Sequence, residues 1–451
     1  MVLSRTESRA RERRKRRRRM RRLAALNIIM LIAIAAMVYG LARGDRIGGG
    51  EGGAGAPSPA VANLEETAPE PGDGVRPSGG NGYTDDGHPA EDEAAGPPGS
   101  GGGEPAPPEG NAPERADGTI RIAFVGDLLL ASSVEKLMRR EGLDYPFAKA
   151  KPYLSEPDLT VGNLEHPVTT RGTPAENKQY VFKGSPDLLP SLREAGFDFV
   201  ALANNHTLDQ GVEGLLDTID HLNEAGIAHA GAGRNDEEAF RPAVFEVKGR
   251  SIAIFSFSRV VPEVSWKADR NHPGVAETYD SRRAVAAISR AKEAHDLVIV
   301  YAHWGEELSY TPRDIEKKLA REYIDAGADI VVGSHPHVLQ GFEYYNGGWI
   351  AYSLGNFVFN PTKNTETRDT GVLNAVCPKD GSCGLAFVPM RAVEPARPEP
   401  LEGEERRAMF ERLEQLSFGV AIDEDGRLRP APVRSGGETE EAGEAVEAGT
   451  P

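Results

Sequence analysis

Short apolar runs alternate with amphipathic stretches along the chain from about Thr119 onwards. The runs read IRIAFVGD, LTVGNLE, FVALANNH, LVIVYAHW and DIVVGSHPH. Their length and composition predict buried β-strands, and periodic apolar residues at 212–225, 281–294 and 314–326 predict helices between them. Alternating strands and helices are typical of an α/β domain with a largely parallel sheet.

Further strands and one more helix are predicted to complete this domain, at 244–247, 252–257, 349–359, near Val372, near Phe387, at 404–416 and at 419–422. The first two of these strands form a hairpin around Lys248-Gly249-Arg250. We therefore expect a folded domain at 118–432. The acidic segment 433–451 that follows is predicted to be a disordered tail.

The N-terminal region has a strong charge asymmetry. Residues 1–22 carry twelve Lys or Arg and two Glu, a net charge of +10, whereas the whole chain carries −17. Residues 23–42 are uncharged and apolar, which is long enough for a transmembrane helix. The basic block on one side predicts a cytoplasmic N-terminus and an extracellular main domain. A cleaved signal peptide is the alternative, although its apolar core is usually shorter.

The segment 43–117 consists mainly of Gly, Pro, Ala, Glu and Asp. This composition cannot bury enough apolar surface to fold, and it predicts a disordered tether between the membrane and the domain. Because the chain beyond residue 22 is acidic, we expect no nucleic acid as partner. The basic segment at 1–22 is expected to contact membrane lipid instead.

The chain has two cysteines, Cys377 and Cys383, separated by five residues. An extracellular location permits a disulfide, and the turn residues Asp380-Gly381 between them could bring the two together. The alternative is a pair of free, buried thiols. A pair with this spacing is a poor zinc signal.

Six residues that can bind metals stand at or just beyond the ends of the apolar runs. They are Asp127, Glu165, Asn205, His303, His335 and His337. In open α/β sheets, side chains just past the carboxyl ends of the strands meet in one crevice. Such a ligand set suits one or two divalent ions of manganese, iron, zinc or cobalt. In Ser334-His335-Pro336-His337, an extended backbone would point both imidazoles the same way.

A single histidine near a strand end is usually a hydrogen-bonded structural residue, so coincidence is the alternative to a metal centre. We interpret four histidines without such neighbours as structural or surface residues, namely His221, His229, His272 and His295. His166 is adjacent to Glu165 and is either a site residue or a loop residue before Pro167.

Several motifs follow one another in the order Gly126-Asp127, Asn163-Leu164-Glu165, Asn204-Asn205-His206, His303-Trp304-Gly305 with Glu307, His335-Pro336-His337 and Ser353-Leu354-Gly355-Asn356-Phe357. This series resembles that of the CapA family, which is associated with capsule and poly-γ-glutamate synthesis and is similar to calcineurin-like metallophosphoesterases. The resemblance covers residues 119–360 and implies a metallophosphoesterase-like layered α/β sandwich, here on an N-terminal transmembrane helix with a disordered linker.

The resemblance implies that the six residues named above hold the ions, with Glu165 between them, and that His206 protonates the leaving group. Four more residues would contact substrate or support the ligands, namely Asn204, Asp209, Glu307 and Asn356. Asp209 either orients His206 or caps the helix that follows. Asn356 either faces the crevice or shapes the turn at Gly355.

The sequence departs from the metallophosphoesterase pattern at one position. Those enzymes usually carry Asp-x-His in the first motif, but Asp127-Leu128-Leu129 has leucine in place of the histidine. One metal position therefore lacks a ligand.

The resemblance favours a membrane-anchored, extracellular protein that acts in synthesis, export or anchoring of an anionic capsule-type polymer through a hydrolase-like metal site. The departure at Leu129 favours a second hypothesis, a non-catalytic module that binds the polymer or a membrane synthase. A cell-wall phosphatase unrelated to capsule would use the same residues.

Overall fold

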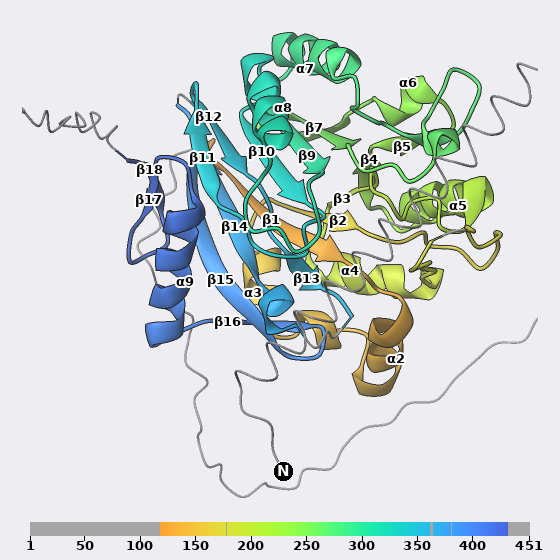
Figure 1. Cartoon of the computed structure of the whole chain (residues 1–451), viewed down its shortest axis with the longest axis horizontal. Coiled ribbons are helices and arrows are strands. Elements are labelled where there is room, and N and C mark those ends of the chain that lie inside the picture. Colours follow the sequence, from red (N-terminus) through yellow and green to blue (C-terminus); the bar gives the residue numbers. More distant parts are fainter. Residues whose placement is uncertain (1–117, 177, 361–363, 380, 432–451) are drawn as a thin grey trace, which may run out of the picture. The chain divides into compact units, whose positions relative to one another are not determined.

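Strands with both faces buried form the centre of the fold. The computed structural model describes residues 118–431 except 177, 361–363 and 380. These residues lie within one compact unit, Gly102–Pro451. Within them, two sheets pack face to face, and helices cover the outer faces (Figure 1). The layered α/β sandwich predicted from the sequence is confirmed.

The first sheet has the strand order β16-β15-β14-β1-β2-β3-β4, with β13 beside the end of β1. Its strands are β1 (Ile120–Leu128), β2 (Leu159–Leu164), β3 (Phe199–Ala201), β4 (Ala228–Ala230), β13 (Asn356–Val358), β14 (Asp369–Cys377), β15 (Gly384–Glu394) and β16 (Arg397–Pro400). Strands β1 to β4 are parallel, whereas β14 to β16 pair antiparallel at one side.

The second sheet has the order β11-β12-β10-β9-β7-β6. Its strands are β6 (Ala243–Val247), β7 (Arg250–Ser258), β9 (Leu297–His303), β10 (Ile330–Ser334), β11 (Phe342–Tyr345) and β12 (Gly348–Ala351). Strands β7, β9, β10 and β12 are parallel, and β6 and β11 pair antiparallel at the two edges. The hairpin predicted around Gly249 is confirmed as β6 and β7.

Alternation of side chains along the strands builds the layers. Ile122 and Phe124 of β1 and Tyr301 of β9 pack between the two sheets. Ala123 of β1 packs toward the helices of the first sheet, and Val300 of β9 toward those of the second. Because successive residues of a strand face opposite sides, a strand covered on both faces must be apolar throughout. Each large apolar side chain buried in this way contributes roughly 1.5–3 kcal/mol.

The helices are α2 (Ser132–Glu141), α3 (Lys151–Ser155), α4 (Leu189–Ala195), α5 (Gly211–Glu224), α6 (Asp236–Ala239), α7 (Arg282–Ala294), α8 (Asp314–Asp325) and α9 (Gly403–Leu416). Helices α2 to α5 contribute to the core over the first sheet, and α7 and α8 to the core over the second. In α5 the apolar stripe is Leu215, Ile219 and Leu222, at the helical spacing. Helix α9 closes the edge of the space between the sheets together with β17 (Val420–Ile422) and β18 (Leu428–Pro430).

Short elements occupy the loops. These are the strand pair β5 (Ala232–Gly233) and β8 (Gly274–Val275), and the 3-10 turns η1 (Tyr145–Phe147), η2 (Pro186–Leu188), η3 (Val264–Trp266) and η4 (Thr365–Arg368).

Two expectations about the sheet are wrong. The strands form two sheets rather than one largely parallel sheet, and the predicted strand at 349–359 is divided between them as β12 and β13. The chain crosses from one sheet to the other at Gly355, whose φ of 66° favours glycine. At this crossing Gly126 approaches Gly355 so closely that a Cβ on Gly126 would lie 1.8 Å from the Gly355 oxygen. Apolar runs alone cannot show such a change of sheet.

Four of the predicted segments lie outside the described residues, namely 1–22, 23–42, 43–117 and 433–451. The domain limits 118–432 stay a prediction. Within the described part of the chain, no helix combines the length and the apolar character needed to cross a membrane. The predicted anchor therefore also stays a prediction.

The predicted disulfide between Cys377 and Cys383 is confirmed. Cys377 ends β14 and Cys383 precedes β15, so the bond closes the connection between two adjacent antiparallel strands. Both cysteines are buried in the core between the sheets.

We predict that replacing both cysteines by alanine lowers the free energy of unfolding by about 2 kcal/mol, because the bond restricts the unfolded chain over a short loop. Urea unfolding of the purified chain, with and without dithiothreitol, measures this difference. The reductant should shift the midpoint of the unmodified protein and leave that of the double variant unchanged. Equal midpoints for both proteins without reductant would contradict the prediction.

Candidate metal centre

Three of the predicted ligands, Asp127, Glu165 and Asn205, lie near the ends of strands of the first sheet. Strand alternation brings Glu165 to the crevice, and a local irregularity brings Asp127 there. Glu165 follows β2 and lies on the same face as Val161, which packs between the sheets. The pairing of β1 with β2 shifts register between Phe124 and Asp127. Leu128 therefore packs in the same layer as Ala123, and Asp127 turns toward the space between the sheets.

The second sheet supplies the imidazoles. His303 is the last residue of β9 and continues the inward-facing series of Tyr301. His335 and His337 follow β10 with φ values of 96° and 57°. The segment is thus not extended, and the expectation that simple alternation aligns these two side chains is wrong. Left-handed backbone at residues other than glycine costs roughly 1–3 kcal/mol each and concentrates at functional sites.

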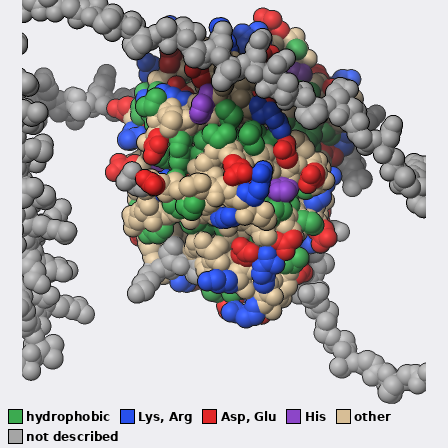
Figure 2. Space-filling view, turned by 90° about the vertical axis from the view of Figure 1, so that its right-hand side faces the viewer, with side chains coloured by type: hydrophobic (Ala, Val, Ile, Leu, Met, Phe, Trp, Pro, Cys, Tyr) green, Lys and Arg blue, Asp and Glu red, His purple; other side chains and the backbone are tan. Residues whose placement is uncertain are grey.

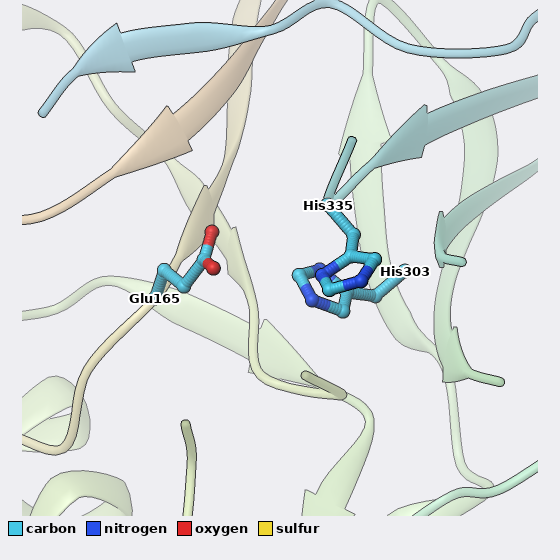
Figure 3. Close-up of side chains that lie close together, drawn as sticks. All are labelled: Glu165, His303 and His335. Carbon is cyan, nitrogen blue, oxygen red and sulfur yellow. The ribbon is translucent and has the colours of Figure 1, made fainter. Parts of the chain in front are cut away.

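The ligand atoms of the predicted residues converge in three overlapping sets. Within each set they lie within 4.8 Å of one another: Glu165, His303 and His335; Asp127, Glu165 and His337; Glu307, His335 and His337. Figure 3 shows the Glu165 carboxylate facing the two imidazoles of the first set. The amide oxygen of Asn205 lies 2.8 Å from Nε2 of His303, so Asn205 belongs to the same cluster. All six predicted ligands therefore come together where the two sheets meet.

Asn163 connects the two carboxylates. Its side-chain amide donates to Asp127 Oδ1 at 2.8 Å and to Glu165 Oε2 at 3.3 Å. Asn163 is fully buried and pairs in register with Asp127 across β1 and β2. Sequence reasoning did not name it as a site residue, although its position two residues before Glu165 on the same strand face gave the signal.

Asn204 supports this arrangement from the next strand end. Its amide donates to Asn163 Oδ1 at 3.0 Å and to the Leu164 carbonyl at 2.8 Å, and its own oxygen accepts from the His206 backbone N–H at 3.0 Å. Through these bonds Asn204 fixes the positions of Asn163 and His206.

His206 forms a buried group with Asp209 and Lys178. Nδ1 of His206 lies 2.7 Å from Asp209 Oδ2, which also accepts from the Phe182 backbone N–H at 2.7 Å. The Lys178 ammonium donates to Asp209 Oδ1 and, at 2.6 Å, to the Asn205 carbonyl. Asp209 thus orients His206, as one of the two sequence interpretations proposed, rather than capping α5 through its side chain.

Lys178 was not predicted. It lies in the loop between β2 and α4, its side chain is 12% exposed, and its ammonium lies 5.0 Å from the Trp266 ring centre. No periodicity or motif marks this position in the sequence. Burial lowers the pKa of Lys178, and the Asp209 carboxylate opposes that shift.

The two carboxylates have opposite pKa shifts. Burial raises the pKa of Glu165 well above its ordinary value, and the negative charge of Asp127 adds to the rise. Burial also acts to raise the pKa of Asp127, but the hydrogen bond and charge of His337 outweigh it, and the pKa is lowered. Burial acts to lower the pKa of His337, but the hydrogen bond and charge of Asp127 outweigh it, and the pKa is raised. The raised pKa values of Glu165 and His337 both reflect the crowding of negative groups at this point.

Three other imidazoles of the centre have lowered pKa values, which favours their neutral form. Burial, followed by the nearby His335 and His337, holds the pKa of His303 well below its ordinary value. Burial lowers the pKa of His335 to about 3. Burial also lowers the pKa of His206, against the effect of Asp209. Neutral imidazoles are the form that binds metals.

Two orphaned polar atoms show that the residues fit a cation. Glu165 Oε1 and His335 Nδ1 are buried and make no hydrogen bond to any described residue. A buried polar atom without a partner costs about 1–3 kcal/mol. Both atoms belong to residues of the first ligand set, and a divalent ion would satisfy both.

The remaining predicted residues lie around this centre. Asn356 is paired in register with Asp127, and its side-chain oxygen lies 2.8 Å from His337 Nδ1. Glu307 is exposed at the rim. His166 is buried with Nδ1 unpartnered, and a Cβ on Gly184 would lie 2.3 Å from its ring. Leu129 is buried against Ala131 and Phe182, so apolar packing fills the position where a metallophosphoesterase has histidine.

We predict that the chelator-treated chain loses stability as the pH falls from about 6.5, the ordinary pKa of histidine, toward 3. The pKa of His335 is depressed in the folded state. Its contribution to stability is therefore present above the pKa of the unfolded chain. As the pH falls below that pKa, the unfolded chain binds a proton at this histidine and the folded chain does not, so the contribution is lost. His335→Gln should reduce the slope by up to about 1.4 kcal/mol per pH unit.

Urea unfolding at a series of pH values in the presence of chelator measures these slopes. His272→Gln, which changes an exposed histidine, should have the slope of the unmodified chain. Parallel slopes for His335→Gln and His272→Gln would contradict the prediction.

Comparison with known proteins assigns the chain to a family. Residues 121–361 match the family described as "Bacterial capsule synthesis protein PGA_cap". The chain is 34% identical over 318 residues to the PGA biosynthesis protein CapA of Bacillus subtilis, covering 69% of this chain and 82% of that protein. It is 34% identical over 294 residues to the capsule biosynthesis protein CapA of Bacillus anthracis, covering 64% of this chain and 71% of that protein.

Among solved structures, the 5'-nucleotidase of Candida albicans aligns with a TM-score of 0.35 and 13% identity, covering 60% of this chain and 51% of that one. The family match spans the strand ends that supply all six predicted ligands, from Asp127 to His337. The chain therefore belongs to the PGA_cap family of bacterial capsule synthesis proteins.

Proposed function

We propose that this chain acts in the synthesis, export or anchoring of an anionic capsule-type polymer such as poly-γ-glutamate, through a metal-dependent hydrolytic site. Family membership and the names of the Bacillus relatives support the polymer. One observation supports the site above all others: Glu165 and His335 each have a buried polar atom without a hydrogen-bond partner among the described residues, and both belong to one ligand set with His303. Burying unpaired polar atoms costs free energy that a bound cation would offset.

The two ligand sets that share Glu165 suggest two ions. Glu165, Asn205, His303 and His335 would hold one, and Asp127, Glu165 and His337 the other. Two divalent ions in such a site supply Lewis-acid polarisation of a phosphoryl or acyl group and an activated water. The mixed nitrogen and oxygen ligands suit manganese, iron, zinc or cobalt.

His206 would deliver a proton to the leaving group. Because its Nδ1 faces Asp209, the protonated form of His206 would donate to Asp209 from Nδ1 and carry the proton for the leaving group on Nε2. Asp209 is held in turn by Lys178 and by the Phe182 backbone N–H, so the imidazole has a fixed orientation. The substrate bond would be a phosphoester or a γ-glutamyl or related polymer bond.

The protein surface gives a reason to place polymer binding at the crevice. Figure 2 shows acidic and basic side chains interspersed on one face of the domain. The described residues of that face therefore present mixed charge to a polyanion, and a polyanion needs bound cations or a basic site for local attraction. The disulfide supports an oxidising, extracellular location for the domain. A membrane anchor at 23–42 and a contact with a polymer synthase complete the proposal.

A non-catalytic binding module is the second candidate, and Leu129 favours it because apolar packing replaces one expected ligand. Elemental analysis of the purified chain before and after chelation, with hydrolysis measured in parallel, separates the two. Two metal equivalents with chelator-sensitive hydrolysis support the hydrolase. One equivalent or none, without hydrolysis of phosphoesters or γ-glutamyl polymer, supports the binding module.

We predict that His206→Asn lowers kcat by about 10²–10⁴-fold for phosphoesters with a poor leaving group such as phenol. The reason is that a leaving group of high pKa needs a proton as the bond breaks. For p-nitrophenyl esters the loss should be much smaller. Steady-state rates on both esters measure this, with His272→Asn as control. Equal losses on both esters would contradict proton donation by His206.

We predict that Lys178→Met lowers kcat for the phenyl ester by about tenfold or more while KM changes little, because methionine keeps the packing on Trp266 but no longer holds Asp209. Lys183→Met is the matched control in the same loop, since its ammonium donates to the exposed Thr170 carbonyl and to no other group among the described residues. The same rate for both variants would show that Lys178 does not position His206.

A further inference from the structure

One of the two metal positions is short of a ligand. Asp127, Glu165 and His337 form its set, whereas the set at the other position contains Glu165, His303 and His335 with Asn205 beside them. The residue that would supply the missing histidine is Leu129, which is fully buried against Ala131 and Phe182. Leucine has no donor atom, so any further protein ligand at this position comes from another residue.

Glu307 lies beside His337 of this position and beside His335 of the neighbouring one. Its carboxylate belongs to a set with His335 and His337 whose ligand atoms all lie within 4.8 Å of one another. Glu307 follows β9 in a loop that is fastened to the histidine segment, because the Leu308 backbone N–H donates to the Pro336 carbonyl at 2.8 Å. Leu308 has a left-handed φ of 62°, so the loop turns sharply just after Glu307.

Unpartnered polar atoms at Glu307 and His335 also support a role for Glu307 as a ligand. Among the described residues, no hydrogen bond or ion pair engages the Glu307 carboxylate, although ligand atoms of His335 and His337 lie within 4.8 Å of it. His335 belongs to the same set, and its buried Nδ1 has no hydrogen-bond partner among the described residues.

We propose that Glu307 is the carboxylate ligand that completes the metal position of Asp127, Glu165 and His337, in place of the histidine that Leu129 replaces. The inference rests on the two-ion centre of the proposed function, but not on hydrolysis.

This substitution of ligand type changes the chemistry of the position. Asp127, Glu165 and Glu307 supply three carboxylates, so two divalent ions leave a net charge of +1 on ions and carboxylates together. A position with one imidazole and three carboxylates is oxygen-rich, and oxygen ligands favour manganese or magnesium over zinc. We therefore infer a manganese-type ion at this position and an imidazole-rich position beside it that also accepts zinc.

Titration of the chelator-stripped, full-length chain with Mn²⁺ alone tests the proposal, with bound metal measured by equilibrium dialysis and elemental analysis. Three variants are compared with the unmodified chain: Glu307→Gln, Glu307→Asp and Glu306→Gln. Glu306 is the matched control, because it is an exposed glutamate one residue earlier in the same loop. Melting temperatures in chelator verify that all four proteins fold alike.

The unmodified chain and Glu306→Gln should bind two equivalents. Glu307→Gln should bind the first ion with unchanged affinity and the second at least about tenfold more weakly. Glu307→Asp keeps the charge but draws the carboxylate back by one methylene, so it should also weaken the second ion. Affinities equal to the control for Glu307→Gln or for Glu307→Asp, or fewer than two equivalents in the unmodified chain, would overturn direct ligation by Glu307. Two bound ions without hydrolysis would overturn the hydrolase function and leave the role of Glu307 standing.

Discussion

Two carboxylates, Asp127 and Glu165, are buried side by side at the ends of adjacent parallel strands. Burial of a carboxylate costs several kcal/mol unless charge or hydrogen bonds compensate it, and two together repel each other. The protein compensates with the amide of Asn163, the imidazole of His337 and a raised pKa at Glu165. One oxygen of Glu165 still has no hydrogen-bond partner among the described residues. Protein groups among the described residues therefore leave this arrangement incomplete, and a bound cation would supply the missing partner.

The packing of two sheets explains how so many polar groups reach one place. Glu165 and Asn163 come from the first sheet and His303 from the second, each on the inward-facing series of its strand. Below them the space between the sheets is filled by apolar side chains, which hold the strand ends in fixed positions. Rigid strands place ligands more accurately than loops do, and the loop that carries Lys178 then covers the side of His206.

Two local departures from regular strand geometry bring in the other ligands. The register shift in β1 turns Asp127 inward, and left-handed backbone at His335 and His337 redirects the chain after β10. The close approach of Gly126 to Gly355 brings Asn356 beside Asp127. The left-handed residues His335 and His337 store backbone strain at the same edge of the sheets where the carboxylates are crowded. Both costs are concentrated at the site, as expected where function rather than stability determines the residue choice.

Much of the fold and most of the candidate site could be predicted from the residues. Apolar runs with both faces buried marked β1, β2, β9 and β10, and polar residues at their ends marked Asp127, Glu165, His303 and His335, because parallel strands end at a common edge. The division of the strands between two sheets could not be predicted, since an apolar run is the same in either sheet. Lys178 was missed because a lysine in an irregular loop carries no periodic signal.

The sequence by itself determined which side chains stand at strand ends, that two cysteines lie within reach of each other, and that leucine replaces a histidine at position 129. Only the tertiary structure decided which sheet each strand joins, how Asp127 and His337 turn toward each other, and that Glu307 returns to the rim of the centre. The reason is physical: composition and spacing act locally along the chain. Register shifts, chain crossings and loop contacts depend on groups distant in sequence, and only packing brings those groups together.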